Sequence, residues 1–394
     1  MTVKIFRALT VTAVFFALTS ASFASEASYA SEAVNNFAFN AARIIMKNSD
    51  GGNFFFSPFS IISAFGMAYA GSKGLTAQEI ETSLRITQDI HGSLGELSKE
   101  LEKEGYLSSA NRVWVKQGLK LRRSFTDILR LNYGSRVKAV DFAGHTDDAL
   151  KEINDWVSMK TNGRINGLIR QLDPETRMIL TNAVYFNAQW KKKFSKSATV
   201  NEKFFVDGTV SGDYREAAMM RQRNDFDYAE IDGVKAVMLP YEGYRLSMVL
   251  MLPAEGETDV LKCLDFGMLK RLTGSMSKYD VDLKLPKFRT EKRYELSEVF
   301  KELGIRRAFG NGADFSGMTE DEPLKIDGVV HQTFIDVDEE RTEAAAATAM
   351  VMLTGTAVPV ERPFAEFHAD RPFFYFVRDN ESGTVLFMGY QSFK

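Results

Sequence analysis

The chain has few of the residues with which familiar enzymes and metalloproteins do their chemistry. Its 394 residues include one cysteine, Cys263, and four histidines. A single cysteine excludes an internal disulfide, and we expect Cys263 to be a small apolar filler of the core rather than a nucleophile. The histidines His91, His145, His331 and His368 match no metal-binding spacing. H-E-x-x-H, G-x-S-x-G, C-x-x-C and G-x-G-x-x-G are missing too, so we expect no metal or other cofactor.

Charge of one sign and long apolar runs are also scarce. The 49 basic residues nearly balance the 52 acidic ones. Such a chain has no strong net field to attract nucleic acid or a charged membrane. Beyond the N-terminus no uncharged stretch is long enough to cross a bilayer. We therefore expect neither a nucleic acid nor a membrane partner, and we expect a monomer.

The N-terminus has the pattern of a secretory signal. Lys4 and Arg7 precede a largely apolar run over residues 8–18, and small residues end it at Ser22-Phe23-Ala24. This pattern predicts a signal peptide over residues 1–24, removed after Ala24. We expect the remaining residues, 25–394, to form one domain of a secreted or periplasmic protein.

Hydrophobic spacing and capping residues predict a mainly helical N-terminal third. Apolar positions over 31–47 recur at helical spacing. Ser57 and Pro58 suit the cap and first turn of a second helix, which Gly71 would end. Thr76-Ala77-Gln78-Glu79 matches a capping box that would begin a third. Further helices are expected at 149–159 and 260–272, and strands at 112–115, 179–190, 236–240, 246–252, 281–288, 373–377 and 384–390.

One segment near the C-terminus has an unusual composition. Residues 339–357 read EERTEAAAATAMVMLTGTA, with four alanines between Thr342 and Thr348. If this chain is extended, alternate side chains from Thr342 to Met352 form one uncharged face, so the segment could serve as a strand. Alanine also favours helices, and a helix or a flexible linker is the alternative. Residues 339–371 form the longest irregular stretch, and loops of that length are often functional or disordered.

Six short motifs in the chain resemble those of the serpin family, in the family's order. They are Asn53-Phe54-Phe55-Phe56-Ser57-Pro58-Phe59-Ser60, Thr181-Asn182-Ala183-Val184-Tyr185-Phe186 with Trp190, Leu285-Pro286-Lys287-Phe288, Ala313-Asp314-Phe315-Ser316-Gly317-Met318, the loop at 339–348, and Ala369-Asp370-Arg371-Pro372-Phe373. The resemblance extends from about residue 31 to Lys394. It implies an α+β fold with several helices around a large mixed sheet, smaller β-sheets and an exposed reactive-centre loop over 339–365.

The resemblance also implies a mechanism. In serpins a protease cuts the exposed loop, and the loop then enters the large sheet as an extra strand. The protease is trapped as an acyl ester because it is distorted before it can hydrolyse that ester. The expected activity is therefore inhibition of a serine protease and not catalysis.

Three groups of residues resemble family sites. Ser57, Ser60, Asn182 and His331 resemble the polar cluster beneath the strands that part, although His331 could also be an ordinary core histidine. Trp190, Lys287 and Glu339 resemble the site where insertion begins, the last two as a possible surface ion pair of small energetic value. The hinge comprises Glu339, Glu340, Arg341, Thr342, Glu343, Ala344, Ala345, Ala346 and Ala347.

The family's spacing also predicts the reactive bond. The scissile residue is expected thirteen positions after Thr342, so the reactive bond lies between Gly355 and Thr356. Leu353 and Thr354 are the alternatives. All of these residues are uncharged, which disfavours a protease with an acidic specificity pocket. We expect elastase-, chymotrypsin- or subtilisin-like targets.

Two other functions compete with inhibition. Arg341 stands where the family often has glycine, and this departure favours a non-inhibitory serpin that acts as a binding or chaperone-like protein. A hydrolase that uses Ser57 or Ser316 would also need a base and an orienting acid, and the sequence identifies neither.

Overall fold

The computed structural model describes residues 29–48, 52–257, 259–342 and 361–394. They form two β-sheets and a set of helices, so the α+β prediction is confirmed. None of the described helices is long and apolar enough to cross a membrane. The predicted signal peptide at 1–24 lies outside the described residues.

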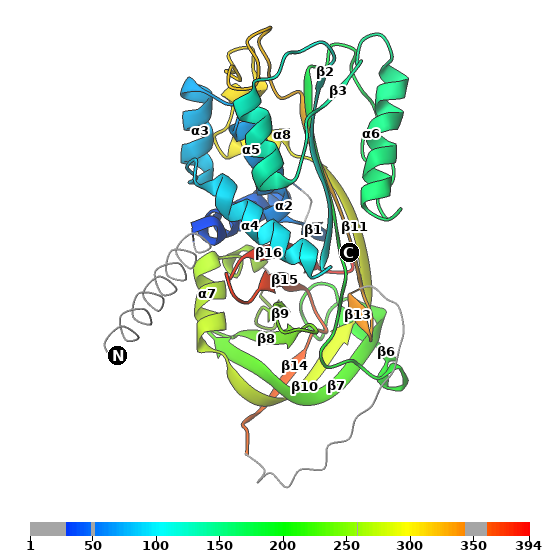
Figure 1. The fold of residues 1–394 in the computed structure, drawn as a ribbon. Helices are drawn as coiled ribbons and strands as arrows, with labels where there is room; N and C mark the ends of the chain where they lie inside the picture. Colours follow the sequence, from blue (N-terminus) through cyan, green and yellow to red (C-terminus); the bar gives the residue numbers. More distant parts are fainter. Residues whose placement is uncertain (1–28, 49–51, 258, 343–360) are drawn as a thin grey trace, which may run out of the picture.

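A seven-stranded sheet contains the segments that matter most for function (Figure 1). Its order is β3-β2-β4-β12-β13-β5, and β11 pairs with β12. The strands are β2 (Leu107–Lys116), β3 (Lys138–Val140), β4 (Met178–Phe186), β5 (Ala188–Gln189), β11 (Phe288–Glu295), β12 (Gly328–Val337) and β13 (Arg341–Thr342). The central strands β4 and β12 run parallel from Gly328 beside Ile179 to Phe334 beside Tyr185. We call the line between these two strands the seam.

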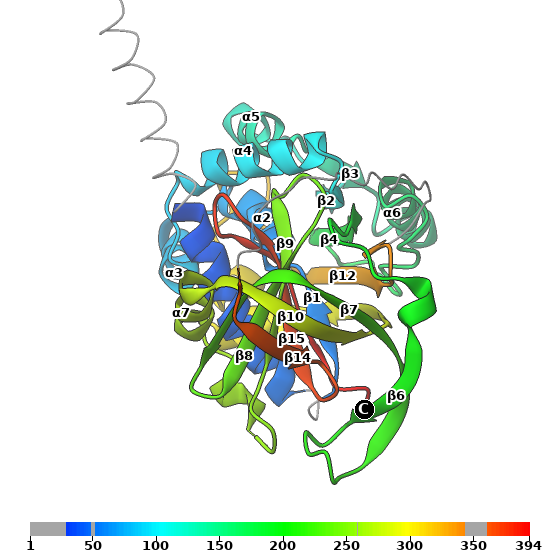
Figure 2. The same ribbon diagram turned by 90° about the horizontal axis from the view of Figure 1, so that it is seen from below.

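The second sheet has nine strands and contains most of the C-terminal chain. Its order is β1-β16-β15-β9-β8-β7-β10-β14, with β6 paired to β7. The strands are β1 (Phe54–Phe56), β6 (Val200–Phe205), β7 (Tyr214–Ile231), β8 (Val234–Pro240), β9 (Leu246–Leu252), β10 (Ser277–Pro286), β14 (Phe364–His368), β15 (Phe373–Asp379) and β16 (Val385–Gln391). Figure 2 shows these strands crossing beneath the seven-stranded sheet.

Helices cover both faces of the seven-stranded sheet (Figure 1). On one face α6 buries Ile153 and Val157 in a small core with Trp114 of β2. The larger core holds α2 and most of the nine-stranded sheet. Besides a helix over 29–47, the helices are α2 (Pro58–Tyr69), α3 (Gly74–Leu84), α4 (Ile90–Lys103), α5 (Arg123–Tyr133), α6 (Thr146–Lys160), α7 (Phe266–Ser275), α8 (Ser297–Glu302) and the short η1 (Lys196–Ala198), η2 (Val260–Lys262) and η3 (Arg307–Phe309).

The predicted capping box is wrong, although the helix exists. Helix α3 begins at Gly74, so Thr76 lies inside it and not at its cap. The Thr76 hydroxyl instead accepts a hydrogen bond from the Asp314 backbone N–H at 2.9 Å, and Glu79 accepts from the backbone N–H groups of Arg306 and Arg307. Both side chains therefore hold a distant loop on the helix.

Three other predicted elements are divided in the structure. The expected strand over 179–190 is interrupted at residue 187, between β4 and β5. The expected strand over 281–288 ends at Pro286 and restarts at Phe288 in the other sheet. The expected helix over 260–272 consists of η2 and α7, because Asp265 caps α7 by accepting from the Met268 N–H at 2.8 Å. Part of the stretch predicted to be irregular is regular, since β14 pairs in parallel with β10.

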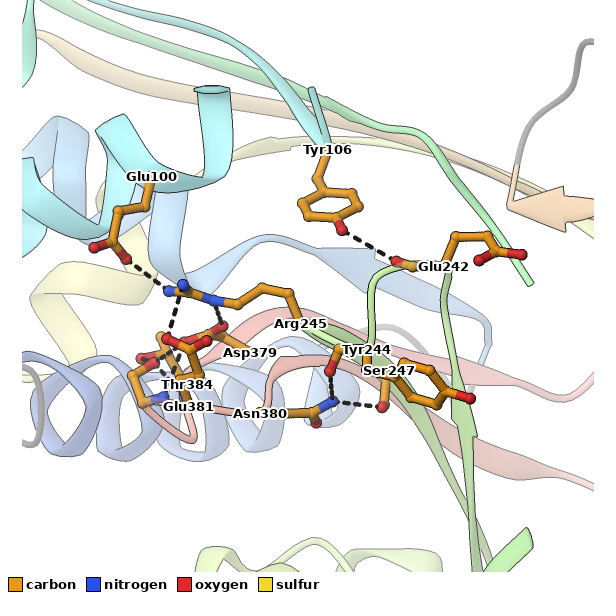
Figure 3. A network of polar contacts seen from close by, with 11 residues as sticks. Glu100, Tyr106, Glu242, Tyr244, Arg245, Ser247, Asp379, Asn380, Glu381 and Thr384 are labelled. Carbon is orange, nitrogen blue, oxygen red and sulfur yellow. Dashed lines mark hydrogen bonds and ion pairs between the residues drawn. The ribbon is translucent and has the colours of Figure 1, made fainter. Parts of the chain in front are cut away.

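A polar network joins α4 to the turns of the nine-stranded sheet (Figure 3). The guanidinium of Arg245 contacts Glu100 at 2.7 Å, Glu381 at 2.9 Å and the fully buried Asp379. Asn380, in the same turn, donates to the Tyr244 carbonyl and the Ser247 hydroxyl, each at 2.8 Å. Burial opposes the charge of Arg245, but the hydrogen bonds to Asp379 and Glu100 raise its pKa.

Candidate functional site

Four predicted side chains meet beneath the seam. Ser57 is the cap of α2 and Ser60 lies in its first turn, while Asn182 and His331 sit side by side on β4 and β12. All four are at most 2% exposed. The Ser57 N–H donates to His331 Nε2 at 3.1 Å, and Asn182 Nδ2 donates to the Ser60 carbonyl at 2.8 Å. The cluster thus ties helix α2 to both strands of the seam.

The hydrogen bonds of His331 define its tautomer. Its Nε2 accepts from a backbone N–H, so Nδ1 must carry the proton and donate to Asn182 Oδ1. Burial lowers the pKa of His331 to about 3, which keeps the ring neutral at physiological pH. A protonated ring would lose the bond from Ser57.

Sequence reasoning missed two members of this cluster. Asn111 of β2 accepts from Asn182 Nδ2 and from the Ser60 hydroxyl, so the network extends to a third strand. The ring of Tyr294 stacks on His331 with centroids 6.4 Å apart. One sequence signal could have indicated Asn111. It lies two residues before the buried Val113 of a predicted strand, so the two side chains share a face of that strand.

A second cluster lies where the chain leaves β12. Trp190 is 1% exposed and donates from Nε1 to the Asp338 carbonyl at 2.9 Å. Its backbone N–H donates to the Glu340 carbonyl at 3.1 Å, and its ring stacks on Tyr241. Residues 338–340 are therefore held through their backbone as well as through their side chains.

The predicted pair of Lys287 and Glu339 is present, but it is not a simple surface pair. Lys287 Nζ lies 2.7 Å from Glu339 Oε2, and the Glu339 side chain is only 6% exposed. The Thr199 hydroxyl donates to Glu339 Oε1 at 2.8 Å, a contact that the sequence did not suggest. Burial acts to raise the pKa of Glu339, but the hydrogen bonds from Lys287 and Thr199 outweigh it and lower that pKa. Lys196 adds an ion pair with Glu340.

In the hinge, Thr342 is paired on both sides and Arg341 on one. Thr342 of β13 is paired with Val337 of β12 and with Ala188 of β5, and Arg341 with Gln189. Thr342 therefore lies at the end of the seam, between the strands that an inserted loop would separate. The hinge residues Glu343 to Ala347 and the predicted reactive-bond residues Leu353, Thr354, Gly355 and Thr356 lie outside the described residues.

On the far side of the loop the chain is anchored again. Arg362 forms an ion pair with Asp225 of β7, and its side chain is 30% exposed. The Pro363 carbonyl accepts from the Asp280 N–H at 3.0 Å, where β14 begins to pair with β10. Arg362 is thus engaged in the fold, which argues against it as the residue that a protease recognises.

The geometry disfavours a serine hydrolase. The Ser57 hydroxyl donates to the Leu386 carbonyl at 2.6 Å and is 1% exposed, so it cannot reach a substrate. Nδ1 of His331 faces an amide and not the carboxylate that would orient a catalytic base. Ser316 is exposed, but in the described part of the chain its hydrogen bonds are with Asp314 and Arg122 and involve no histidine.

Comparison with known families identifies the fold. The family model described as "Serpin (serine protease inhibitor)" matches residues 32–392. The chain is a serpin. The resemblance drawn from the six motifs is therefore confirmed, and serpins are protease inhibitors rather than enzymes, although some members are non-inhibitory.

Curated relatives cover most of this serpin. An uncharacterized serpin-like protein of Thermococcus kodakarensis is 41% identical over 366 residues, which are 91% of this chain and 84% of that protein. The human leukocyte elastase inhibitor is 34% identical over 377 residues, covering 91% of this chain and 98% of that protein.

Solved structures agree with the assignment. Serpin48 of the insect Tenebrio molitor, described as a highly specific serpin, is 31% identical with a TM-score of 0.81, covering 92% of this chain and 98% of its own. Human thyroxine-binding globulin is 28% identical, also with a TM-score of 0.81 and the same coverage. The serpin fold thus includes both protease inhibitors and ligand carriers.

Proposed function

We propose that this serpin is an exported inhibitor that traps a serine protease as a covalent acyl complex by inserting its cut loop into the seam. The observation that carries the proposal is the pairing of Thr342 with both Val337 and Ala188 at the end of the seam. Thr342, the last described residue before the loop, is already aligned with the place that an additional strand would take. Export is inferred from the signal-like residues 1–24.

The acyl complex follows from an interrupted proteolysis. The protease serine attacks the loop carbonyl, expels the amine and leaves an ester that water normally hydrolyses. Insertion of about a dozen residues at ~3.3 Å each moves the attached protease by ~40 Å. Catalytic groups distorted by that movement no longer hydrolyse the ester, because small misplacements already slow chemistry greatly.

The target class follows from the loop residues. Met352, Leu353, Thr354, Gly355 and Thr356 are uncharged. An elastase-, chymotrypsin- or subtilisin-like pocket accepts such residues, whereas a trypsin-like pocket leaves its acidic group unpaired. The resemblance to leukocyte elastase inhibitors supports the same class.

A non-inhibitory binding or chaperone-like role is the second candidate, and Arg341 is the observation that favours it. Arginine at this position is bulkier and less flexible than the glycine that the family often has. Slower insertion would leave the protease time to complete hydrolysis. The cut chain would then be released as an ordinary substrate.

The test is to incubate the secreted protein with elastase, chymotrypsin, subtilisin and trypsin. We expect complexes with one of the first three that survive denaturant, and mass spectrometry in denaturant should show a C-terminal peptide that begins at Thr356. A protease whose catalytic serine is replaced by alanine is the matched control and should give no such complex. Cleavage of the loop with no covalent complex for any protease would favour the non-inhibitory role.

A further inference from the structure

The end of the seam opposite β13 contains a cavity of about 380 Å³. It lies between the segment that joins α6 to β4, the start of β12 and the end of β11. Its lining includes Arg293, Lys325, Asp327, Thr176 and Ile179. None of these residues belongs to the two clusters described above.

The basic groups of this cavity keep unused donors. Arg293 donates from Nε to the Leu168 carbonyl at 2.6 Å and makes no other hydrogen bond or ion pair among the described residues. Its guanidinium is desolvated, and both burial and the nearby Arg170 lower its pKa. Lys325 Nζ lies 3.5 Å from Asp327 Oδ1, a long contact for an ion pair.

Four acidic residues line the cavity: Asp173 and Glu175 are exposed to solvent, whereas Glu295 and Asp327 are engaged in hydrogen bonds. Glu295 Oε1 accepts from the hydroxyl of Ser297 at 2.6 Å and from the Val329 N–H at 3.2 Å. Asp327 Oδ2 accepts from the backbone N–H groups of residues 177 and 178. Glu295 and Asp327 are therefore occupied as acceptors, and Arg293 and Lys325 keep donors for an additional carboxylate, which the exposed Asp173 and Glu175 oppose.

The pairing of β13 shows where an inserted strand would end. Thr342 is paired with Val337 and Ala188, which are 149 positions apart in the sequence. Gly328 and Ile179, paired across the seam near its other end, are also 149 positions apart. A single antiparallel strand that continues from Thr342 can therefore pair with both sides of the seam without a shift in register.

Counted along this register, the cut end of the loop reaches the cavity. Residue 351 falls opposite Gly328 and Ile179, where the pairing of β12 with β4 begins. If the strand continues extended past this point, Thr354 reaches the level of Lys325 and Thr176, which precede the two strands. Gly355 is one position further, next to Glu175. Thr176, Lys325 and Glu175 all line the cavity.

We propose that this cavity binds the C-terminal carboxylate that cleavage creates at Gly355, with Lys325 and Arg293 as its partners. This inference rests on the proposed function. Hydrolysis of the bond to Thr356 consumes one water and leaves a carboxylate on Gly355 and an amine on Thr356. The trapped ester has no such carboxylate, so the site stabilises the released, cleaved form and not the covalent complex.

The test uses two synthetic peptides of residues 342–355 with the uncut full chain. One ends in a free carboxylate and the other in a carboxamide. Peptide entry is followed on native gels, and dissociation is measured after dilution. Because charge-assisted contacts to a carboxylate are stronger than neutral ones, we expect the acid to dissociate about fivefold more slowly than the amide.

Three variants locate the effect. Lys325→Gln should remove most of the difference between acid and amide, and Glu175→Gln should increase it because an acidic neighbour is lost. Lys103→Gln, on the exposed end of α4, is the matched control and should change nothing. Equal dissociation of the two peptides in the original chain would overturn the carboxylate site and leave insertion intact. Failure of both peptides to enter would instead contradict insertion, and with it the proposed function.

Discussion

At the scale of single residues, the seam depends on polar side chains that are buried and neutral. His331 accepts the Ser57 N–H only while it is unprotonated. His91 is buried likewise, and burial lowers its pKa to about 4. A histidine with a lowered pKa binds protons more readily in the unfolded chain. Its contribution to stability is therefore complete above its ordinary pKa of 6.5 and is lost as the pH falls towards the lowered value.

We expect the urea midpoint of the uncut protein to fall between pH 6.5 and pH 4. The free energy lost is the sum of the two histidine contributions, and other groups that titrate below about pH 5 add to it at the acidic end. His91→Phe should make this decline shallower while leaving the seam contacts in place. An unchanged slope in that variant would show that His91 does not carry the effect.

Arg245 is the residue on which the network of Figure 3 depends. Arg245→Met would leave the fully buried Asp379 with only its bonds from Ser382 and would destabilise the uncut protein by about 3 kcal/mol. Adding Asp379→Asn should restore much of the loss, because the unpaired charge disappears. Denaturant unfolding of the single and double variants measures both effects. A double variant as unstable as Arg245→Met would contradict an electrostatic origin.

At the scale of elements, the sequence predicted correctly those helices and strands whose bounds depend on contacts between neighbouring residues. The cap of α2 at Ser57 and the strands expected at 373–377 and 384–390 are set by neighbours in sequence, and they match α2, β15 and β16 of the structure. The capping box at Thr76 failed because Asp314, 238 residues away, uses its hydroxyl. Strand β14 was missed because its partner β10 also lies far away in the chain.

The same distinction between local and long-range contacts applies to the residues of the two clusters. Residue motifs indicated Ser57, Asn182 and His331, which the structure brings together, but their roles in insertion remain predictions. Asn111 and Thr199 could not be inferred, because each is a polar residue whose meaning depends on a partner far along the chain. For the hinge beyond Thr342, the sequence pattern alone supports the prediction.

The register of β13 can be tested with one substitution. Thr342→Arg should turn the inhibitor into a substrate, since residue 342 is already paired between β12 and β5 and a bulky charged residue there should hinder entry of the residues that follow it. Because Thr342 is paired in the uncut chain as well, the melting temperature of each uncut variant is measured as a control, and Thr342→Ser should retain both that temperature and inhibition. The ratio of covalent complex to cleaved chain on denaturing gels reports the outcome. Full trapping by Thr342→Arg would contradict this register.

At the scale of the whole molecule, the uncut chain should be a kinetically trapped form. The seam is closed by the parallel pairing of β4 and β12, and a strand between them would add hydrogen bonds on both sides. We expect nicking within 353–356 to raise the melting temperature by about ten degrees or more, because insertion adds several strand contacts. Calorimetry before and after nicking checks this, and an unchanged midpoint would argue against insertion.

The strands that follow the loop carry a further consequence. β14 is hydrogen-bonded to β10, and the buried β15 and β16 complete the same sheet, so residues 361–394 stay in place when the chain is cut before them. The two pieces of the cut chain stay together in one molecule, but the cleaved peptide bond of the loop does not form again. Each copy therefore acts once, and under the proposed function protection lasts only as long as synthesis supplies new copies to match the proteases present.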